Sequence, residues 1–319
     1  MDEFSFINAI KQKAYSQPTL VKGIGDDAAV FRSTSDIVTT VDTFVENIHF
    51  SLETMRPFHI GYRVLAANIS DLAAMGAEPA FYLVSMCIPK TWNQKALEEI
   101  YQGMHELASL HQMDLIGGDT VSSDRLMISI TAMGYVPKDQ ARFRSDAQPN
   151  DIIFATGTLG DSRAGLEILL QGQECKSQDY YIQRHRLPEP RVALALGLRE
   201  INRVALNDIS DGISNEANEI AEASGVGIFI IEDSVPVSES FHQFSEEQQY
   251  EWKLSGGEDF ELLGTISKAN WPRVQEIADQ INTPIRQIGY VYEAEEPRVL
   301  IQTHGETKQL TKSGYTHLK

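Results

Sequence analysis

The sequence predicts a two-domain protein of the α/β (α+β) class. Its 319 residues correspond to about two domains of ordinary size. Short apolar runs of strand length alternate with segments whose apolar residues recur at helical spacing. A polar segment at 137–150, with a proline near each end, separates two such alternating halves. We therefore expect domains at 1–147 and 148–319.

The first half contains three helical patterns and five strand-like runs. Pro57 is suited to the first turn of the longest helix, and Gly76 follows its last apolar position. The expected helices lie at 2–15, 57–75 and 94–111, and the expected strands at 28–32, 37–42, 81–88, 126–136 and a run entering 117–119.

The second half repeats the alternation. Four helical patterns are expected at 161–171, 190–199, 213–224 and 272–281. Strands are expected at 152–155, 205–209, 227–231, 285–292 and 298–301.

The charge balance restricts the classes of partner. The chain has 27 Lys and Arg against 45 Asp and Glu, a formal net charge of −18. Such a surface repels nucleic-acid phosphates and anionic lipid headgroups, so neither nucleic acid nor membrane is expected as a partner. If the protein handles phosphates, metal cations must neutralise the repulsion.

The N-terminal residues and the cysteines predict a soluble cytoplasmic protein. No basic stretch followed by an apolar one is visible after Met1, so no signal peptide is expected. The longest apolar runs are far too short for a membrane span. Cys87 and Cys175 occur in unrelated contexts, which excludes a disulfide framework or a thiolate metal site.

Common catalytic signatures are absent from the sequence. Gly23, Gly25 and Ala28 match the spacing of a dinucleotide-binding turn, but no convincing strand precedes them and two aspartates would face the pyrophosphate. There is no P-loop, no nucleophile elbow and no zinc-protease helix motif. The eight histidines are scattered without metal-ligand spacing.

A repeated pattern of acids and glycines remains, at positions where a strand is expected to end or a helix to begin. In an α/β fold such joints line one crevice, where converging carboxylates repel each other unless they share cations. Carboxylate oxygens suit Mg²⁺, and glycines let backbone N–H groups approach phosphates. The six segments are 25–27, 40–42, 68–71, 117–119, 208–212 and 255–259.

Each candidate also has a structural interpretation. Asp71 could be solvated on an exposed helix face, and Asp211 could be a helix N-cap. His49 could be a half-buried histidine with satisfied hydrogen bonds, and Arg144 a solvated residue of the polar linker. Tyr101, on a helix, could be a core aromatic. The combination of six segments, rather than any one of them, indicates a site.

Five segments and the C-terminal stretch Gly314–His317 resemble the thiamine-monophosphate kinase family, over nearly the whole chain. SDLAAMGA and SGGED are quite specific to these kinases within the aminoimidazole ribonucleotide synthetase-like superfamily. The segments are GIGDDAAV at 23–30, NISDLAAMGAEP at 68–79, GGDT at 117–120, DISDGIS at 208–214 and SGGEDFEL at 255–262.

The resemblance implies ATP-dependent phosphorylation of thiamine monophosphate to thiamine diphosphate, the last step of thiamine diphosphate biosynthesis, with several Mg²⁺ ions and ATP as co-substrate. It also implies a homodimer with the two-domain fold of the superfamily. In that fold the N-terminal sheet pairs into a dimeric barrel, and a C-terminal mixed sheet with helices completes the active site.

The resemblance also assigns residues to roles. The implied metal ligands are Asp27, Thr40, Val41, Asp42, Asp71, Asp119, Asp208 and Asp211. The implied nucleotide contacts are Gly118, Asp119, Arg144, Ser210 and Tyr101, and the implied substrate contacts are His49, Glu258 and Tyr315.

The sequence departs from the family pattern at two of these positions. Val41 stands where the family often has Thr, so a metal ligand there must be the backbone carbonyl. Tyr315 stands where Trp or Phe is common, and it keeps an aromatic plane for stacking on the thiamine ring.

Direct in-line phosphoryl transfer is the simplest mechanism, because no activated Ser, Cys or His suggests a phosphoenzyme. Asp71, Asp119, Asp208 and Arg144 are the expected catalytic groups. Two alternatives stay open: another ATP-using synthetase of the superfamily, and a nucleotide-binding regulator without turnover.

Overall fold

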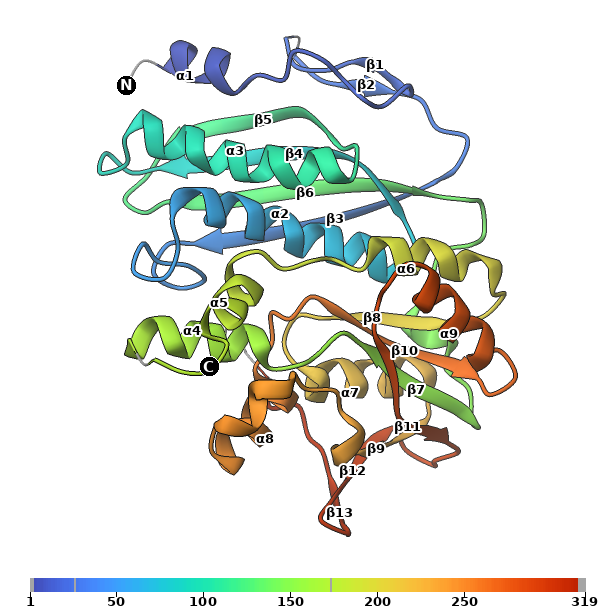
Figure 1. Ribbon diagram of the computed structural model, residues 1–319. Coiled ribbons are helices and arrows are strands. Elements are labelled where there is room, and N and C mark those ends of the chain that lie inside the picture. Colours follow the sequence, from blue (N-terminus) through green and yellow to red (C-terminus); the bar gives the residue numbers. More distant parts are fainter. Residues whose placement is uncertain (1–2, 26, 173, 315–319) are drawn as a thin grey trace. The chain divides into compact units, whose positions relative to one another are not determined.

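The chain folds into two compact units, each described here by itself. The structure is a computed structural model that describes residues 3–25, 27–172 and 174–314 (Figure 1). Unit 1 comprises Met1–Leu72 and Ala77–Asp139, and unit 2 comprises Ala73–Gly76 and Gln140–Lys319. Among the described residues, no helix is both long and apolar enough to cross a membrane.

Unit 1 is built on a four-stranded sheet with the strand order β3-β6-β4-β5. Neighbouring strands are antiparallel except β4 and β5, which are parallel. Along β6, half-buried and buried side chains alternate, so one face of the sheet carries the core. The strands are β3 (Asp36–Val45), β4 (Glu78–Ile88), β5 (Asp114–Ser122) and β6 (Met127–Val136).

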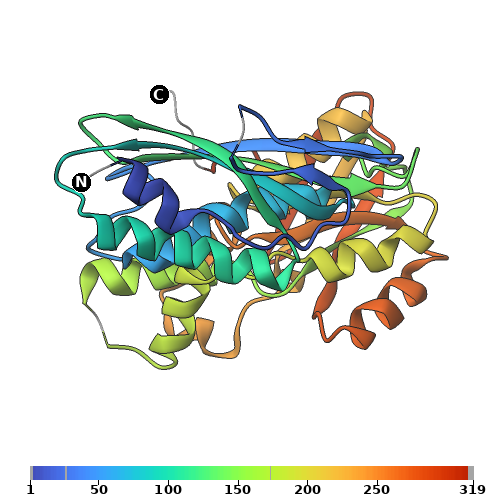
Figure 2. The same cartoon turned by 90° about the horizontal axis from the view of Figure 1, so that it is seen from above.

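Two long helices, α2 (Pro57–Ala74) and α3 (Gln94–Leu110), lie over this sheet (Figure 1). Gly61 and Gly103 allow their backbones to approach closely, because a Cβ at either position would overlap a backbone carbonyl of the other helix. The short helix α1 (Glu3–Ile10) lies along α3 (Figure 2). A two-stranded ribbon, β1 (Leu20–Lys22) with β2 (Val30–Phe31), completes the unit.

Unit 2 contains a mixed seven-stranded sheet with the order β13-β12-β9-β11-β7-β10-β8. Only β12 and β9 pair in parallel among these neighbours in the described part of the chain. The strands are β7 (Asp151–Thr156), β8 (Ala205–Ile209), β9 (Gly227–Ile231), β10 (Glu261–Ser267), β11 (Ile285–Tyr292), β12 (Arg298–Thr303) and β13 (Glu306–Gln309).

Helices cover both faces of this sheet. On one face, α7 (Ile213–Ser224) packs Ile213, Ala217 and Ile220 into a large apolar core. On the other face, α6 (Val192–Gly197) and α9 (Trp271–Gln280) bury a second core. A third cluster joins α4 (Asp161–Gln171), α5 (Gln178–Arg186) and α8 (Glu246–Ser255). Because helices cover both faces of the sheet, nearly all side chains of β7, β8 and β10 are buried.

Most elements expected from the sequence are present, and several were missed. The helices at 161–171 and 213–224 and the strands at 205–209, 227–231 and 285–292 have the expected bounds. The expected helix over 2–15 is wrong beyond Ile10, because residues 12–17 are instead hydrogen-bonded to the beginning of β5. The strand expected at 28–32 is reduced to β2. The sequence analysis missed β1, α5, α8, β10 and β13.

The expectation that the acid and glycine segments lie at joints is wrong for three of the six. Residues 40–42 lie within β3, 68–71 within α2 and 117–119 within β5. For 40–42 the physical reason is the antiparallel pairing of β3 with β6, which does not bring the carboxyl ends of neighbouring strands to one edge of the sheet. For 68–71, Asp71 lies within a helix and accepts the Thr40 hydroxyl of β3. For 117–119, the parallel strand β5 continues beyond the segment to Ser122.

Candidate active site

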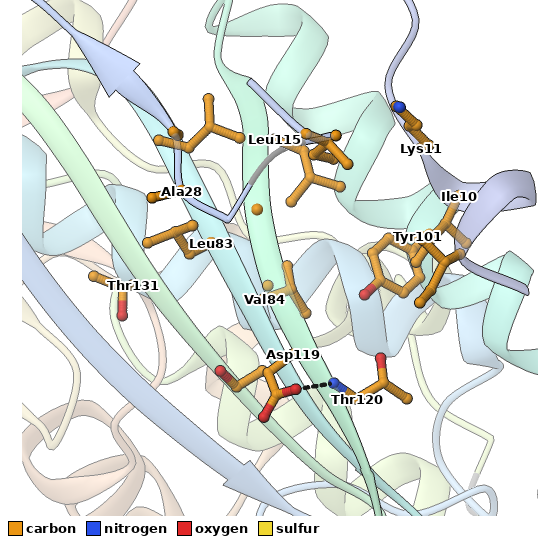
Figure 3. A pocket seen from close by; sticks show the side chains of 18 of the residues that line it. Ile10, Lys11, Ala28, Leu83, Val84, Tyr101, Leu115, Asp119, Thr120 and Thr131 are labelled. Atoms are coloured by element: carbon orange, nitrogen blue, oxygen red, sulfur yellow. Dashed lines mark hydrogen bonds between the residues drawn. The ribbon is translucent and has the colours of Figure 1, made fainter. Parts of the chain in front are cut away.

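A pocket of about 650 Å³ opens in unit 1 between α1, α3, the 24–29 segment and the sheet (Figure 3). Three of the predicted nucleotide contacts, Tyr101, Gly118 and Asp119, line it together with the predicted metal ligand Asp27. Apolar side chains form most of the remaining wall. A cavity with apolar walls and a few polar groups is typical of a small-molecule or cofactor site.

Tyr101 lies on α3 and is only 8 % exposed. Its ring meets Phe6 of α1 edge to face, with the ring centroids 5.9 Å apart. Burial raises the pKa of the Tyr101 phenol far above its usual range, so the hydroxyl stays protonated and can donate a hydrogen bond inside the pocket. Tyr101 therefore is a buried aromatic, as in the alternative interpretation, and it also lines the pocket, while its role as a nucleotide contact stays a prediction.

Gly118 and Asp119 lie side by side on β5, which pairs in parallel with β4. A Cβ at Gly118 would overlap the carbonyl of Val84, so the close approach of the two strands requires glycine there. The exposed Asp119 carboxylate accepts a hydrogen bond from the Thr120 amide at 2.9 Å (Figure 3).

Thr40, Val41 and Asp42 follow one another on β3, so Thr40 and Asp42 share one face of the strand and Val41 takes the other. The Thr40 hydroxyl donates a hydrogen bond to Asp71 Oδ2 on α2. Val41 is 61 % exposed. Asp71 is half-buried rather than on a fully exposed helix face, and the neighbouring Asn68 is buried, with its amide donating to the Val64 carbonyl at 3.0 Å.

His49 is held in one orientation by its own turn. The Val45 amide donates to His49 Nδ1 at 3.1 Å, and the imidazole meets Phe44 edge to face at 5.5 Å. Because Nδ1 accepts, the neutral ring carries its proton on Nε2.

In unit 2, the predicted residues around β8 and the 255–260 loop lie together. Asp208 is buried at the end of β8, and Ser210 and Asp211 follow it. The Glu258 amide donates to the Ser210 carbonyl at 2.6 Å, and the Phe260 amide donates to the Ile209 carbonyl at 3.0 Å. These two bonds place Glu258 directly beside the Ser210 segment.

Arg144 is 52 % exposed, but it is not simply solvated. Its Nε donates to Asn207 Oδ1 at 2.9 Å, and its guanidinium pairs with Glu219 at 3.4 Å. Asn207 also donates to Glu219 at 3.0 Å, which closes the arrangement. The residue before Asp208 therefore holds Arg144 beside β8.

Comparison with known proteins identifies the family. Residues 25–136 match the AIR synthase related protein, N-terminal domain, and residues 148–302 match its C-terminal domain. The thiamine-monophosphate kinase of Bacillus subtilis (strain 168) is 44 % identical over 326 residues, covering 100 % of both chains. The chain belongs to the thiamine-monophosphate kinase family.

Solved structures of this family have the same fold. The thiamine-monophosphate kinase of Stenotrophomonas maltophilia K279a superposes with a TM-score of 0.85 at 34 % identity, covering 96 % of this chain and 98 % of the other. A structure described as AaThiL complexed with AMPPCP and TMP has a TM-score of 0.77 at 31 % identity, covering 92 % of each chain. Family membership and the two-domain fold expected from the resemblance are both confirmed.

For this member of the thiamine-monophosphate kinase family, sequence reasoning missed the residues that hold the site segments in place. Buried Glu216 on α7 accepts the amides of Ser210 and Asp211 at 3.3 and 2.8 Å. Burial raises the pKa of Glu216 well above its ordinary value, against the opposing effect of the hydrogen bond from Asp211. For Glu216 the available signal was an acid in the first turn of a predicted helix. Asn207 on β8 and Glu219 on α7, which hold Arg144, were also missed.

The described acids of this kinase-family chain do not form a preformed metal cage. Among the described residues, no group of three or more His, Cys, Asp or Glu is arranged to hold a metal ion. The donor chemistry still fits Mg²⁺, because Mg²⁺ commonly binds one or two carboxylates together with waters and substrate phosphates. The predicted ligand set stays a prediction, and Tyr315 lies outside the described residues, as does Asp26 of the 25–27 segment.

Proposed function

We propose that this chain transfers the γ-phosphoryl group of ATP to the phosphate of thiamine monophosphate, forming thiamine diphosphate and ADP. The observation that carries the proposal is the placement of Tyr101, Gly118 and Asp119 around one pocket. Support also comes from full-length relatives named as thiamine-monophosphate kinases and from a relative complexed with AMPPCP, an ATP analogue, and TMP.

The proposed binding roles follow the family positions. The nucleotide occupies the unit 1 pocket and also uses Arg144 and Ser210. Thiamine monophosphate uses His49, Glu258 and Tyr315. His49 and Glu258 suit this role because each has an orientation set by backbone hydrogen bonds, at His49 Nδ1 and at the Glu258 amide.

Mg²⁺ would be held by carboxylates at the family positions and by two further groups of β3. Bound there, it would neutralise phosphate charge that a chain of net charge −18 otherwise repels. The proposed ligands are Asp27, Thr40, the carbonyl of Val41, Asp42, Asp71, Asp119, Asp208 and Asp211.

The proposed reaction is a single in-line displacement. An oxygen of the acceptor phosphate forms a bond to the γ-phosphorus while the bond to the β–γ bridging oxygen breaks, and ADP leaves with that oxygen. A phosphate monoester, with a second pKa of about 6, is already largely dianionic at neutral pH, so no general base is required. The Arg144 guanidinium, held by Asn207 and Glu219, would stabilise charge on the transferring group.

We also propose a homodimer in which unit 1 sheets of two subunits join into a barrel. This proposal is supported by β3, a ten-residue strand that pairs only with β6 among the described strands and whose side chains are mostly exposed or half-buried. Light scattering should give about twice the 35.6 kDa chain mass. The domain limits 1–147 and 148–319 also remain a proposal, to be tested by limited proteolysis.

One incubation tests the activity. The protein is mixed with ATP, Mg²⁺ and thiamine monophosphate, and the products are separated so that ADP is distinguished from AMP. Thiamine diphosphate formed one-for-one with ADP is the expected result. Mg²⁺-dependent ATP binding without product would reject this acceptor and favour another superfamily reaction or a regulator.

A further inference from the structure

The pocket of unit 1 contains one basic side chain among its described lining residues, Lys11. Its acidic lining residues are Asp27 and Asp119. Figure 3 shows Lys11 beside Ile10 and Tyr101 at one end of the pocket, whereas Asp119 lies at the other end. The sequence analysis gave Lys11 no role.

Lys11 is fixed in position by its neighbours in the chain. Its amide donates to the Ile7 carbonyl at 3.0 Å, which closes the last turn of α1. The next residue, Gln12, donates to Asp114 Oδ1 and accepts from the Leu115 amide, both at 2.7 Å. The backbone at Lys11 is therefore tied to the first residues of β5.

Asp114 extends this anchor. The carboxylate is fully buried and accepts the amides of Ser16 and Gln17 at 2.8 and 2.7 Å. A buried carboxylate with several amide donors is a strong and oriented connection. Leu115 lines the pocket, so these hydrogen bonds hold the backbone next to Lys11 against a strand of the pocket wall.

The surroundings of Lys11 suit a heterocyclic base better than phosphates. Ile10 and the ring of Tyr101 give apolar surfaces at this end, and the Lys11 ammonium is a hydrogen-bond donor there (Figure 3). The phosphates of a nucleotide would be bound through cations held by Asp119, so we place them at the Asp119 end of the pocket, away from Lys11. The ring nitrogens of adenine are acceptors, which match an ammonium donor.

We propose that Lys11 binds the nucleotide by donating a hydrogen bond from its ammonium to a ring nitrogen of adenine. The proposal rests on the proposed function, because it requires ATP in this pocket. It makes α1 and its Asp114 anchor part of the nucleotide site.

The test compares Lys11→Met with Lys13→Met, a change of the same kind at an exposed lysine outside the pocket lining. Dissociation constants for ATP and for adenosine are measured by competition with a fluorescent nucleotide, at low and high salt. Lys11→Met should weaken both ligands by about 10-fold, the usual size for a charged hydrogen bond, and Lys13→Met should leave both unchanged.

Two outcomes overturn the proposal while ATP binding by the unchanged protein keeps the proposed function intact. Unchanged affinity in Lys11→Met excludes a contact. A loss for ATP alone, shrinking at high salt, places the ammonium on phosphates instead of the base. If the unchanged protein binds no ATP, the proposed function itself fails.

A second measurement separates a base contact from a structural effect. The affinities of 1-deaza-, 3-deaza- and 7-deaza-ATP are measured with both proteins. Removing the contacted nitrogen should weaken binding to the unchanged protein but not to Lys11→Met, a coupling that a merely structural role would not produce. Additive losses for all three analogues would contradict the ring-nitrogen contact.

Discussion

The two units treat their acidic residues differently. In unit 2, Glu261 is completely buried and contacts two arginines, Arg184 at 2.8 Å and Arg191 at 2.6 Å. Although burial alone would raise it, the hydrogen bond from Arg191 and the charge of Arg184 hold the pKa of Glu261 below its usual value. In unit 1, Asp27 and Asp119 are exposed on the pocket wall.

This difference separates structural charges from charges suited to ligands. A carboxylate already enclosed by arginines has its charge balanced within the fold, and removing it leaves buried cations. A carboxylate on a pocket wall keeps oxygen lone pairs for a cation that arrives with a nucleotide. The comparison therefore predicts stability effects at Glu261 and activity effects at the proposed ligands.

Glu261→Gln should give the largest loss of stability. The change removes the buried counter-charge that Arg184 and Arg191 share and leaves Arg191 only its pair with the exposed Glu189. Breaking a buried pair costs about 3–5 kcal/mol. Urea unfolding measures the loss. Glu200→Gln is the control, because its pair with Arg273 is largely exposed and is therefore screened by solvent. Similar losses in both variants would remove the distinction between a buried and an exposed ion pair.

Asp71→Asn should lower turnover and leave stability nearly unchanged, in contrast to Glu261→Gln. It removes the charge of a proposed metal ligand and retains an oxygen that can accept the Thr40 hydroxyl. We expect turnover to fall by about 100-fold or more, the usual loss for a positioned electrostatic group, with the unfolding free energy nearly unchanged. Product formation and urea unfolding are both measured. Asp124→Asn, on an exposed turn, is the control. Turnover like that of the unchanged chain would remove Asp71 from the metal site.

The buried carboxyl of Asp259 in unit 2 should make the stability of the protein depend on pH. Burial raises the pKa of its carboxyl to about 7, although it accepts amides from Gly160 and Ser162. As pH rises from about 4 to about 7, the unfolded chain releases this proton first, so the Asp259 contribution to stability falls. Asp259→Asn should therefore gain about 2 kcal/mol relative to the unchanged protein between pH 5 and pH 7.

Urea unfolding at half-unit pH steps measures the Asp259 effect. Groups other than Asp259 titrate in both proteins, so only the difference between the two profiles is interpreted. Parallel profiles would mean that the carboxyl is ionised throughout and that its two amide donors outweigh burial.

Glu258→Ala should give the smallest effect, confined to the acceptor. Loss of a proposed substrate contact should raise the apparent KM for thiamine monophosphate by about 10-fold and leave the KM for ATP nearly unchanged. Steady-state kinetics with each substrate varied in turn measures this. Tyr315→Ala should behave in the same way. Equal changes for both substrates would argue against an acceptor-specific role for these residues.

The sequence predicted regular elements well where the apolar pattern was uninterrupted. The helix 213–224 and the strand 285–292 have their expected bounds. The strand β10 was missed because it begins with the charged residue Glu261. Arg184, Arg191 and the Thr156 hydroxyl, all distant in the sequence, compensate the burial of that carboxylate. The helix expected over 2–15 ended early because Asp114, about 100 residues away, takes the amides of Ser16 and Gln17.

The site residues, like the secondary-structure elements, could be predicted only in part from the sequence. Tyr101, Gly118 and Asp119 were expected together as nucleotide contacts, and they line one pocket. Glu216, Asn207 and Lys11 were not expected, because each is an ordinary residue of a helix, a strand or a loop until its neighbours in space are known.

The sequence by itself determined the kinase family, the alternation of elements and the acidic character of the chain, because these depend on residue identity and local spacing. The tertiary structure alone decided that several of the acids lie within strands and within a helix, that Glu261 is balanced by arginines, and that Lys11 lines a pocket. Those outcomes depend on contacts between residues far apart in the chain, and no local pattern encodes them.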